Sequence, residues 1–150
     1  MNTQELAAKL RAEHDAVDAL SDRLREWVAV IPRANVAEWI AELRQRFEHF
    51  RAHMTRHMAL EEQEGYMTTV VELRPTLSAE VERLQHEHQE ITKIMAGVHA
   101  AVEALCKEDR LLVRDCCRRI DSLIHYVEHH ENDENMLLIT TLTSEIGTKD

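Results

Sequence analysis

Four stretches of the sequence carry apolar residues at alternating spacings of three and four, and this periodicity limits the fold more than any other feature. An α-helix turns once in about 3.6 residues, so the spacing places these side chains on one face that must be buried. The second stretch is expected to end near Gly65 or to fray towards Pro75. In the fourth stretch, the apolar face continues to Leu137. Residue types that cap a helix start stand before each stretch, at Thr3, Asn35, Ser78 and Asp109.

The composition agrees with long helices. Only three glycines and two prolines occur among 150 residues, and aromatic residues make up 4%. Such usage is typical of helical proteins rather than of β-sheet proteins. Since the predicted connections are short, neighbouring helices should be antiparallel, which predicts an all-α, up-down-up-down antiparallel four-helix bundle. The length favours a single domain over residues 1–150.

The formal charge of −10 argues against partners that are themselves anionic. Such a surface repels nucleic acid and anionic lipid, so neither is expected as a partner. No apolar run approaches the roughly 20 residues that a membrane-spanning helix requires, and the first residues lack an apolar signal core. We therefore expect a cytoplasmic protein. Its three cysteines, an odd number without a C-x-x-C pair, are expected to be reduced thiols.

Six polar residues interrupt the apolar stripes, and we call them the six-residue cluster. They are His14, His57, Glu61, His88, His130 and Glu134. The second and fourth predicted helices each carry a histidine four residues before a glutamate, which places both side chains on one face. Other histidines fall off the stripes and are expected to face solvent, among them His49, His99 and His125.

The cluster follows an internal repeat. The segment EHDAVDAL at 13–20 is similar to EHQEITKI at 87–94, and corresponding cluster residues are separated by 73 or 74 positions. The chain therefore reads as one helical hairpin repeated. Antiparallel pairing brings the start of one helix beside the end of the next, so the polar residues of both hairpins should meet at one level of the bundle.

Two carboxylates and four imidazoles in an apolar core are costly unless cations lie among them. A pair of divalent or trivalent metal ions would balance them, with Glu61 and Glu134 as bridges and the four histidines as terminal ligands. Ferritin-like di-iron bundles use Glu-x-x-His pairs, but none of the ten histidines has glutamate three positions before it. The HExxH motif of zinc proteases is also absent.

The order His14, His57-xxx-Glu61, His88, His130-xxx-Glu134 resembles the haemerythrin-like, or HHE cation-binding, family over about residues 3–143. The resemblance implies a non-haem centre of two iron ions, bridged by an oxo or hydroxo group and by two carboxylates. It implies that the six residues are the iron ligands. It also implies that a small molecule, O₂, peroxide or NO, binds or reacts there, while catalytic residues stay unknown.

The sequence departs from the oxygen-carrying members at one position. Their third helix supplies two histidines one turn apart, whereas Leu84 and Thr92 flank His88 here. An iron with one imidazole fewer is more open, which favours binding or turnover of a small molecule over simple oxygen carriage. The residues that can substitute for this ligand are His53, Tyr126, His129 and Glu62.

Two alternatives remain open from the sequence. One is an iron or oxygen sensor, or a metal store, without turnover. The other is a structural site in which zinc substitutes for iron. A homodimer or another protein partner is compatible with each. Glu13 and Glu87, which precede ligand histidines, are expected on an exposed face rather than against the ligands, and Trp27 and Trp39 are expected to pack at one end of the bundle.

Overall fold

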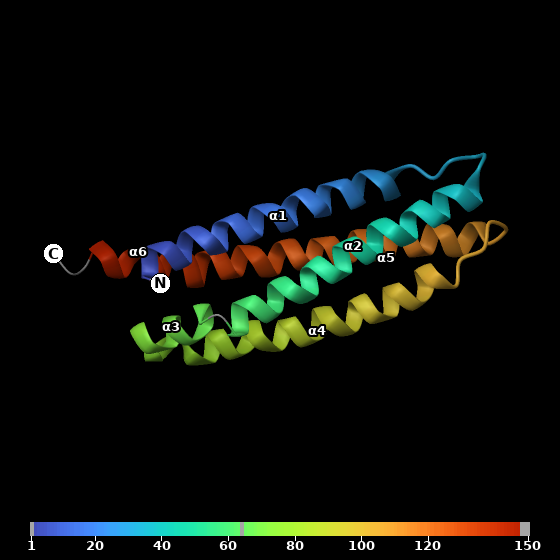
Figure 1. Cartoon of the computed structure of the whole chain (residues 1–150). Coiled ribbons are helices and arrows are strands. Elements are labelled where there is room, and N and C mark those ends of the chain that lie inside the picture. The colour runs from blue at the N-terminus through green and yellow to red at the C-terminus, as the bar shows by residue number, and fades with distance from the viewer. Residues whose placement is uncertain (1, 64, 148–150) are drawn as a thin grey trace.

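The computed structural model of the protein describes residues 2–63 and 65–147, which are almost entirely helical and contain no strand. Four long helices lie side by side, and shorter segments extend the bundle at one end (Figure 1). The elements are α1 (Thr3–Ala29), α2 (Val36–Gln63), α3 (Tyr66–Leu73), the 3-10 turn η1 (Pro75–Leu77), α4 (Ser78–Glu103), α5 (Arg110–Glu134), the π-helical segment η2 (Asn135–Ile139) and α6 (Thr140–Gly147). The predicted all-α class is confirmed.

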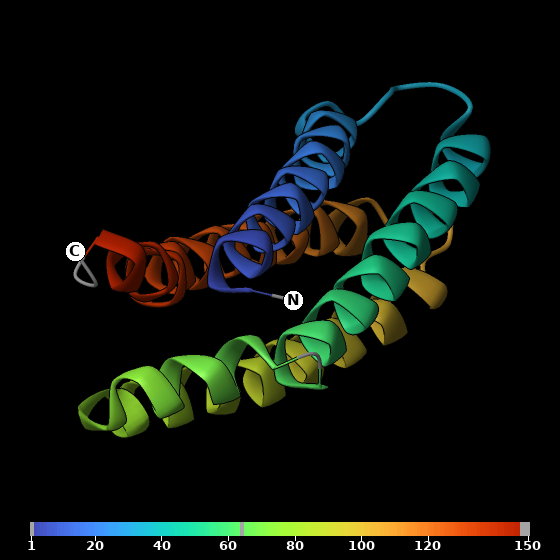
Figure 2. The ribbon, with the colours of Figure 1, turned by 60° about the vertical axis from the view of Figure 1, so that its left-hand side comes forward.

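The long helices form a four-membered ring in which α1 and α4 each pack against both α2 and α5. The α1–α2 and α4–α5 connections lie at one end, and α3, α6 and the start of α1 lie at the other (Figures 1 and 2). Every packed neighbour is therefore antiparallel, as the up-down-up-down bundle requires. Within the part of the chain that the structure describes, no helix is both long and apolar enough to cross a membrane.

The helix starts differ in detail from the caps predicted. Asn2 rather than Thr3 caps α1, because its side-chain carbonyl accepts from the Glu5 amide at 2.8 Å in a capping box. Ser78 lies inside α4, since the turn η1 already begins the helical path and Leu77 occupies the cap position. Asp109 stands at the predicted cap of α5, where its backbone carbonyl accepts from Val113 at 2.9 Å.

The second predicted helix ends at Gln63, close to the expected boundary, and a separate helix follows. Gly65 has a φ of 91°, which L-residues with a side chain rarely adopt, and it redirects the chain into α3. Tyr66, Met67 and Val70 of α3 are buried. The stretch before Pro75 is thus a packed helix rather than a frayed end.

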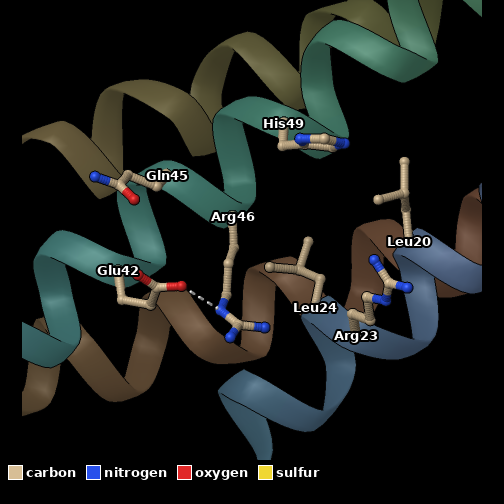
Figure 3. Close-up of a pocket in the computed structure, with 7 residues that line it drawn as sticks. All are labelled: Leu20, Arg23, Leu24, Glu42, Gln45, Arg46 and His49. Carbon is tan, nitrogen blue, oxygen red and sulfur yellow. Dashed lines mark hydrogen bonds and ion pairs between the residues drawn. The ribbon is translucent and has the colours of Figure 1, made fainter.

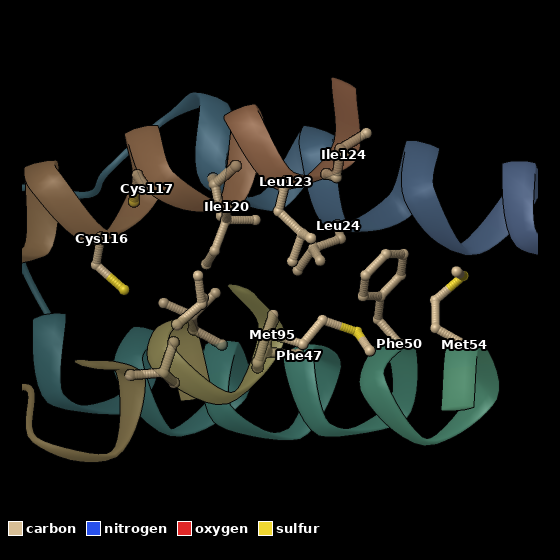
Figure 4. Packing of buried hydrophobic residues seen from close by; sticks show 14 of the residues in the cluster. Leu24, Phe47, Phe50, Met54, Met95, Cys116, Cys117, Ile120, Leu123 and Ile124 are labelled. Carbon is tan, nitrogen blue, oxygen red and sulfur yellow. The ribbon is translucent and has the colours of Figure 1, made fainter. Parts of the chain in front are cut away.

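The described core consists of two apolar clusters. The larger fills the bundle from Val17 of α1 towards the α1–α2 and α4–α5 connections, and its packing is shown in Figure 4. The smaller joins Leu10 and Leu84 to side chains from α3, η2 and α6. Cys116 and Cys117 are free thiols buried in the larger cluster, and burial raises the pKa of each to about 11. They act as small apolar side chains.

The tryptophans pack where they were expected, near the α1–α2 connection. The Trp27 and Trp39 rings stack with centroids 6.1 Å apart, and the Arg46 guanidinium lies 4.3 Å from the Trp27 centroid. Arg46 also donates to Glu42 at 2.9 Å beside a surface cavity of about 580 Å³, which exposed His49 lines (Figure 3). These residues stabilise the end of the bundle away from the six-residue cluster.

Candidate metal centre

All members of the six-residue cluster are buried and meet between the two apolar clusters. Each is at most 3% exposed. One residue comes from α1, one from α4, and a histidine–glutamate pair from each of α2 and α5. On α1, His14 lies between Leu10 of the smaller cluster and Val17 of the larger one, and on α4 His88 lies between Leu84 and Ile91 in the same way. The polar residues of both hairpins therefore meet at one level, as the repeat predicted.

The cluster divides into two groups of four potential metal ligands. The first contains His14, His57, Glu61 and Glu134, and the second contains Glu61, His88, His130 and Glu134. Within each group the donor atoms lie within 4.8 Å of one another. Both carboxylates belong to both groups, so each position has two imidazoles of its own and shares two carboxylates with the other.

The Nε2 atom of every cluster histidine faces these carboxylates. His14 Nε2 lies 3.3 Å from both Glu61 Oε2 and Glu134 Oε1. His88 Nε2 lies 3.2 Å from Glu61 Oε1 and 3.5 Å from Glu134 Oε2. His57 and His130 each place Nε2 3.3 Å from the glutamate four residues later in the same helix. The i,i+4 spacing on α2 and α5 thus produces the predicted convergence.

The opposite ring nitrogen, Nδ1, lies within hydrogen-bond distance of an oxygen in three of the four histidines. His14 Nδ1 lies 2.7 Å from Asn135 Oδ1, His88 Nδ1 lies 2.9 Å from Glu62 Oε2, and His130 Nδ1 lies 2.8 Å from Glu87 Oε1. Because these oxygens accept, Nδ1 donates and the neutral ring keeps its lone pair on Nε2, towards the carboxylates. His57 Nδ1 has Glu13 Oε2 at a longer 3.8 Å.

Two glutamates have a different role from the one the sequence suggested. Glu87 was expected on an exposed face, but it reaches from α4 to His130 and is itself bound by Arg83 at 2.9 Å. Glu62 was a candidate for the missing ligand, but it contacts the Nδ1 side of His88 and belongs to neither donor group. Both side chains are long enough to cross to a neighbouring helix, which single-helix periodicity does not reveal.

The other candidates for an extra ligand also lie outside the two donor groups found in the described part of the chain. Tyr126 is 55% exposed, and His129 is exposed and pairs with Asp133 at 3.7 Å. His53 is half-buried, and burial together with Arg56 lowers its pKa. Among the described residues, none therefore adds a further donor to either group, and each group has two imidazoles.

Asn135 is a further contact that the sequence did not indicate. It begins the π-helical segment η2 directly after Glu134. A π-helix has a wider turn than an α-helix and often occurs at functional sites. Leu138 of this segment is fully buried, and Leu137, which was expected on the inward stripe, is half-buried and packs against the smaller apolar cluster.

Many polar atoms at the centre lack hydrogen-bond partners. Three histidine Nε2 atoms, on His57, His88 and His130, have none, nor do Glu61 Oε1 and both carboxylate oxygens of Glu134. Leaving a buried polar atom unsatisfied costs about 1–3 kcal/mol, and more when it is charged. Metal ions among these atoms would satisfy them together, and the donor set of imidazole and carboxylate fits such ions.

Without metal, protons have to balance the charges. Burial lowers the pKa of His14 and His88, but the close carboxylates of Glu134 and Glu61 outweigh it and raise these values to about 11 and about 10. Burial lowers the pKa of His57 to about 3. Burial and the charge of Glu134 raise the pKa of Glu61, whereas contacts with Glu61 and the histidines hold that of Glu134 below its usual value. A bound metal has to displace the protons on His14 and His88.

An antiparallel helical bundle with two adjoining His₂Glu₂ groups in its core is a metal-binding bundle. The family model of the hemerythrin HHE cation-binding domain matches residues 5–142, and the chain belongs to this family. Comparisons with curated proteins and with solved structures gave no match. Cation binding thus follows both from the family and from the geometry of the donor groups.

Proposed function

We propose that the protein holds two iron ions, one in each donor group, and that this centre binds or reacts with O₂, peroxide or NO. The observation that supports the proposal is the sharing of Glu61 and Glu134 by two pairs of imidazoles. Shared carboxylates suit two cations that lie close together, because one carboxylate can bridge both. The six predicted ligands are those that meet at this point.

The donor chemistry favours iron within the range of metals that such a site accepts. Imidazole suits iron, zinc and copper, and carboxylate suits harder ions, so a mixed set fits iron well. Bound iron would supply electron exchange with a small oxidising molecule. Each group offers at most four donor residues, fewer than iron commonly takes, which leaves room for such a molecule.

The chain's own residues prepare the site for this role. Glu62, Glu87 and Asn135 fix the orientation of three imidazoles through Nδ1. Apolar residues on either side of the polar layer, such as Leu10 and Val17, keep bulk water away. A small uncharged molecule can enter such an environment more readily than a large or charged one, which supports a diatomic ligand or peroxide.

Metal analysis combined with spectroscopy tests the proposal. Protein from iron-replete cells should contain about two irons per chain, and its optical spectrum should change reversibly with reductant and with O₂ or NO. Zinc in place of iron, with no spectrum that depends on oxidation state, would instead support the structural site. Absence of any bound metal would contradict both.

A sensor without turnover is the second candidate, and one observation favours it. The donor groups connect all four long helices, so occupancy of the centre is coupled to the stability of the whole bundle. Occupancy could then be read by a protein partner or by a second copy of the chain. Rapid consumption of peroxide or NO by the iron-loaded protein would exclude this candidate.

A further inference from the structure

A polar cavity of about 260 Å³ lies between α1 and α5, beside the metal centre. The two helices are neighbours along their length (Figures 1 and 2). The lining is made up of oxygen-bearing side chains, namely Asp18, Ser21, Asp22, Glu128, Glu131, Asn132 and Asn135. None of them belongs to the six-residue cluster.

Two of these side chains are buried and each has a polar atom without a hydrogen-bond partner. Glu131 is 3% exposed and its Oε1 atom has no hydrogen-bond partner, and Ser21 is 2% exposed and its Oγ atom has none. Buried polar atoms of this kind are ordinarily satisfied. Both residues line the same cavity, so one occupant bound between them can satisfy both atoms.

Only some of the carboxylates that line the cavity are paired with a basic side chain. Arg25 pairs with Glu128 and, at 3.4 Å, with Asp22. Neither Asp18 nor Glu131 has an ion pair with a basic side chain within the described residues. Two carboxyl groups thus face the cavity without a basic ion-pair partner, and burial together with the nearby Asp18 carboxylate raises the pKa of Glu131 to about 9.

We propose that this cavity is a third cation site, which takes a hard divalent cation with Asp18, Ser21 and Glu131 as its main donors. Carboxylate, hydroxyl and amide oxygens, without imidazole or thiolate, are the ligands of Mg²⁺, Ca²⁺ and Mn²⁺. The six-residue cluster contains four imidazoles and therefore favours metals such as iron and zinc. Asn135 lies between the two, because it lines the cavity and accepts from His14 Nδ1 at 2.7 Å.

Manganese is a direct probe, because free Mn²⁺ can be counted by electron paramagnetic resonance. The protein is first saturated with Zn²⁺, with zinc content measured, and then titrated with Mn²⁺. We expect one further ion per chain, displaced by excess Ca²⁺ or Mg²⁺. Asp18→Asn should weaken this binding on the order of tenfold or more, and Asp15→Asn, on the same helix but outside the cavity, should leave it unchanged.

Glu131→Gln is the second variant, since the amide keeps the shape of the side chain and removes its charge. It should weaken Mn²⁺ binding as Asp18→Asn does. A zinc-loaded protein that binds no Mn²⁺ would overturn the proposal and leave Glu131 as a neutral buried acid. Equal Mn²⁺ binding by the wild type and both variants would also overturn it. Zinc content reports separately on the six-residue cluster, so failure of the proposed function is distinguishable.

Discussion

The four cluster histidines have similar surroundings on the Nε2 side and different ones on the Nδ1 side. The carboxylates of Glu62 and Glu87 make His88 and His130 stronger electron donors, whereas His14 faces the neutral amide of Asn135. The two donor groups therefore have the same number of imidazoles without being equivalent. Metal affinity should accordingly differ between them.

Removing a cluster histidine should remove metal and destabilise the fold. In His57→Ala or His130→Ala, the carboxylate of Glu61 or Glu134 loses its i,i+4 imidazole in the core, and leaving such a buried polar group unsatisfied costs about 1–3 kcal/mol. We expect less bound metal per chain and a lower melting temperature. His125→Ala is the control, because His125 is exposed and such changes stay within about 0.5 kcal/mol. Equal behaviour of all three variants would contradict the assignment.

The outer hydrogen bonds should also affect affinity. Glu87→Ala removes the acceptor of His130 Nδ1 and the partner of Arg83, so metal affinity should fall roughly 10–100-fold. Glu90→Ala on the same helix removes an exposed carboxylate that pairs with His86, and affinity should be kept. Competition with a chelator measures both. An unchanged Glu87→Ala affinity would show that His130 needs no such support.

Periodicity predicts which residues point inwards but not what they meet. The HxxxE spacing placed His57 and Glu61 correctly, because both lie on one helix. The contact of Glu87 with His130 crosses between helices and depends on side-chain conformation, so an exposed face was predicted for Glu87 instead. The sequence therefore predicts the candidate donor residues, but it does not predict the hydrogen bonds that orient them.

At the scale of elements, the end of the bundle near the metal centre is closed by α3 and α6. These short helices pack against each other and complete the smaller apolar cluster. Their positions depend on Gly65, which turns the chain after α2, and on the π-helical segment after Glu134. Nothing in the local sequence distinguishes a π-turn from a continued α-helix, which is why the π-helical segment was not predicted.

Two glycines allow the turn at Gly65 to be tested. Gly65→Ala should destabilise the protein by about 1–2 kcal/mol, because alanine rarely adopts the φ of 91° found there. The added Cβ itself has room, since its nearest neighbour, Thr69 Oγ1, would lie at 3.8 Å. Gly97→Ala lies within α4, where alanine favours the helix and the new Cβ meets only the end of Arg119 at 3.2 Å, so stability should stay equal or rise by up to about 1 kcal/mol. Denaturant unfolding compares the two. A neutral Gly65→Ala would show that this turn is not constrained.

At the scale of the whole molecule, the polar layer divides the core into two apolar parts. Residues on both sides of it, such as Val127 and Leu138, are fully buried, so the helices cannot separate at this level without exposing the core. The bundle shape was predictable, since it follows from apolar stripes and short connections. The stability of the bundle, by contrast, depends on which charges occupy the layer.

The stability of metal-free and metal-loaded protein should therefore depend differently on pH. The raised pKa values of His14 and His88, about 11 and about 10, stabilise the metal-free fold fully below pH 6.5, and this stabilisation is lost as pH rises through those values. The pKa values of His57 and Glu134 are both lowered in the fold, so the stabilisation from these two groups is lost in acid, below that pH. Burial also raises the pKa of Glu61 to about 7 and that of Glu131 to about 9, so their contribution to stability is likewise lost as pH rises. Metal-free protein should thus melt progressively lower as pH rises from 6.5 towards 10.

Metal binding should strengthen over the same range, because the ion competes with the protons on His14 and His88. The difference in melting temperature between loaded and chelator-stripped protein should then widen as pH rises from 6.5 to 9. Loading stripped protein at pH 7 in weak buffer should also release protons. A melting difference that does not depend on pH, or loading without proton release, would mean that cations do not replace these protons in the core.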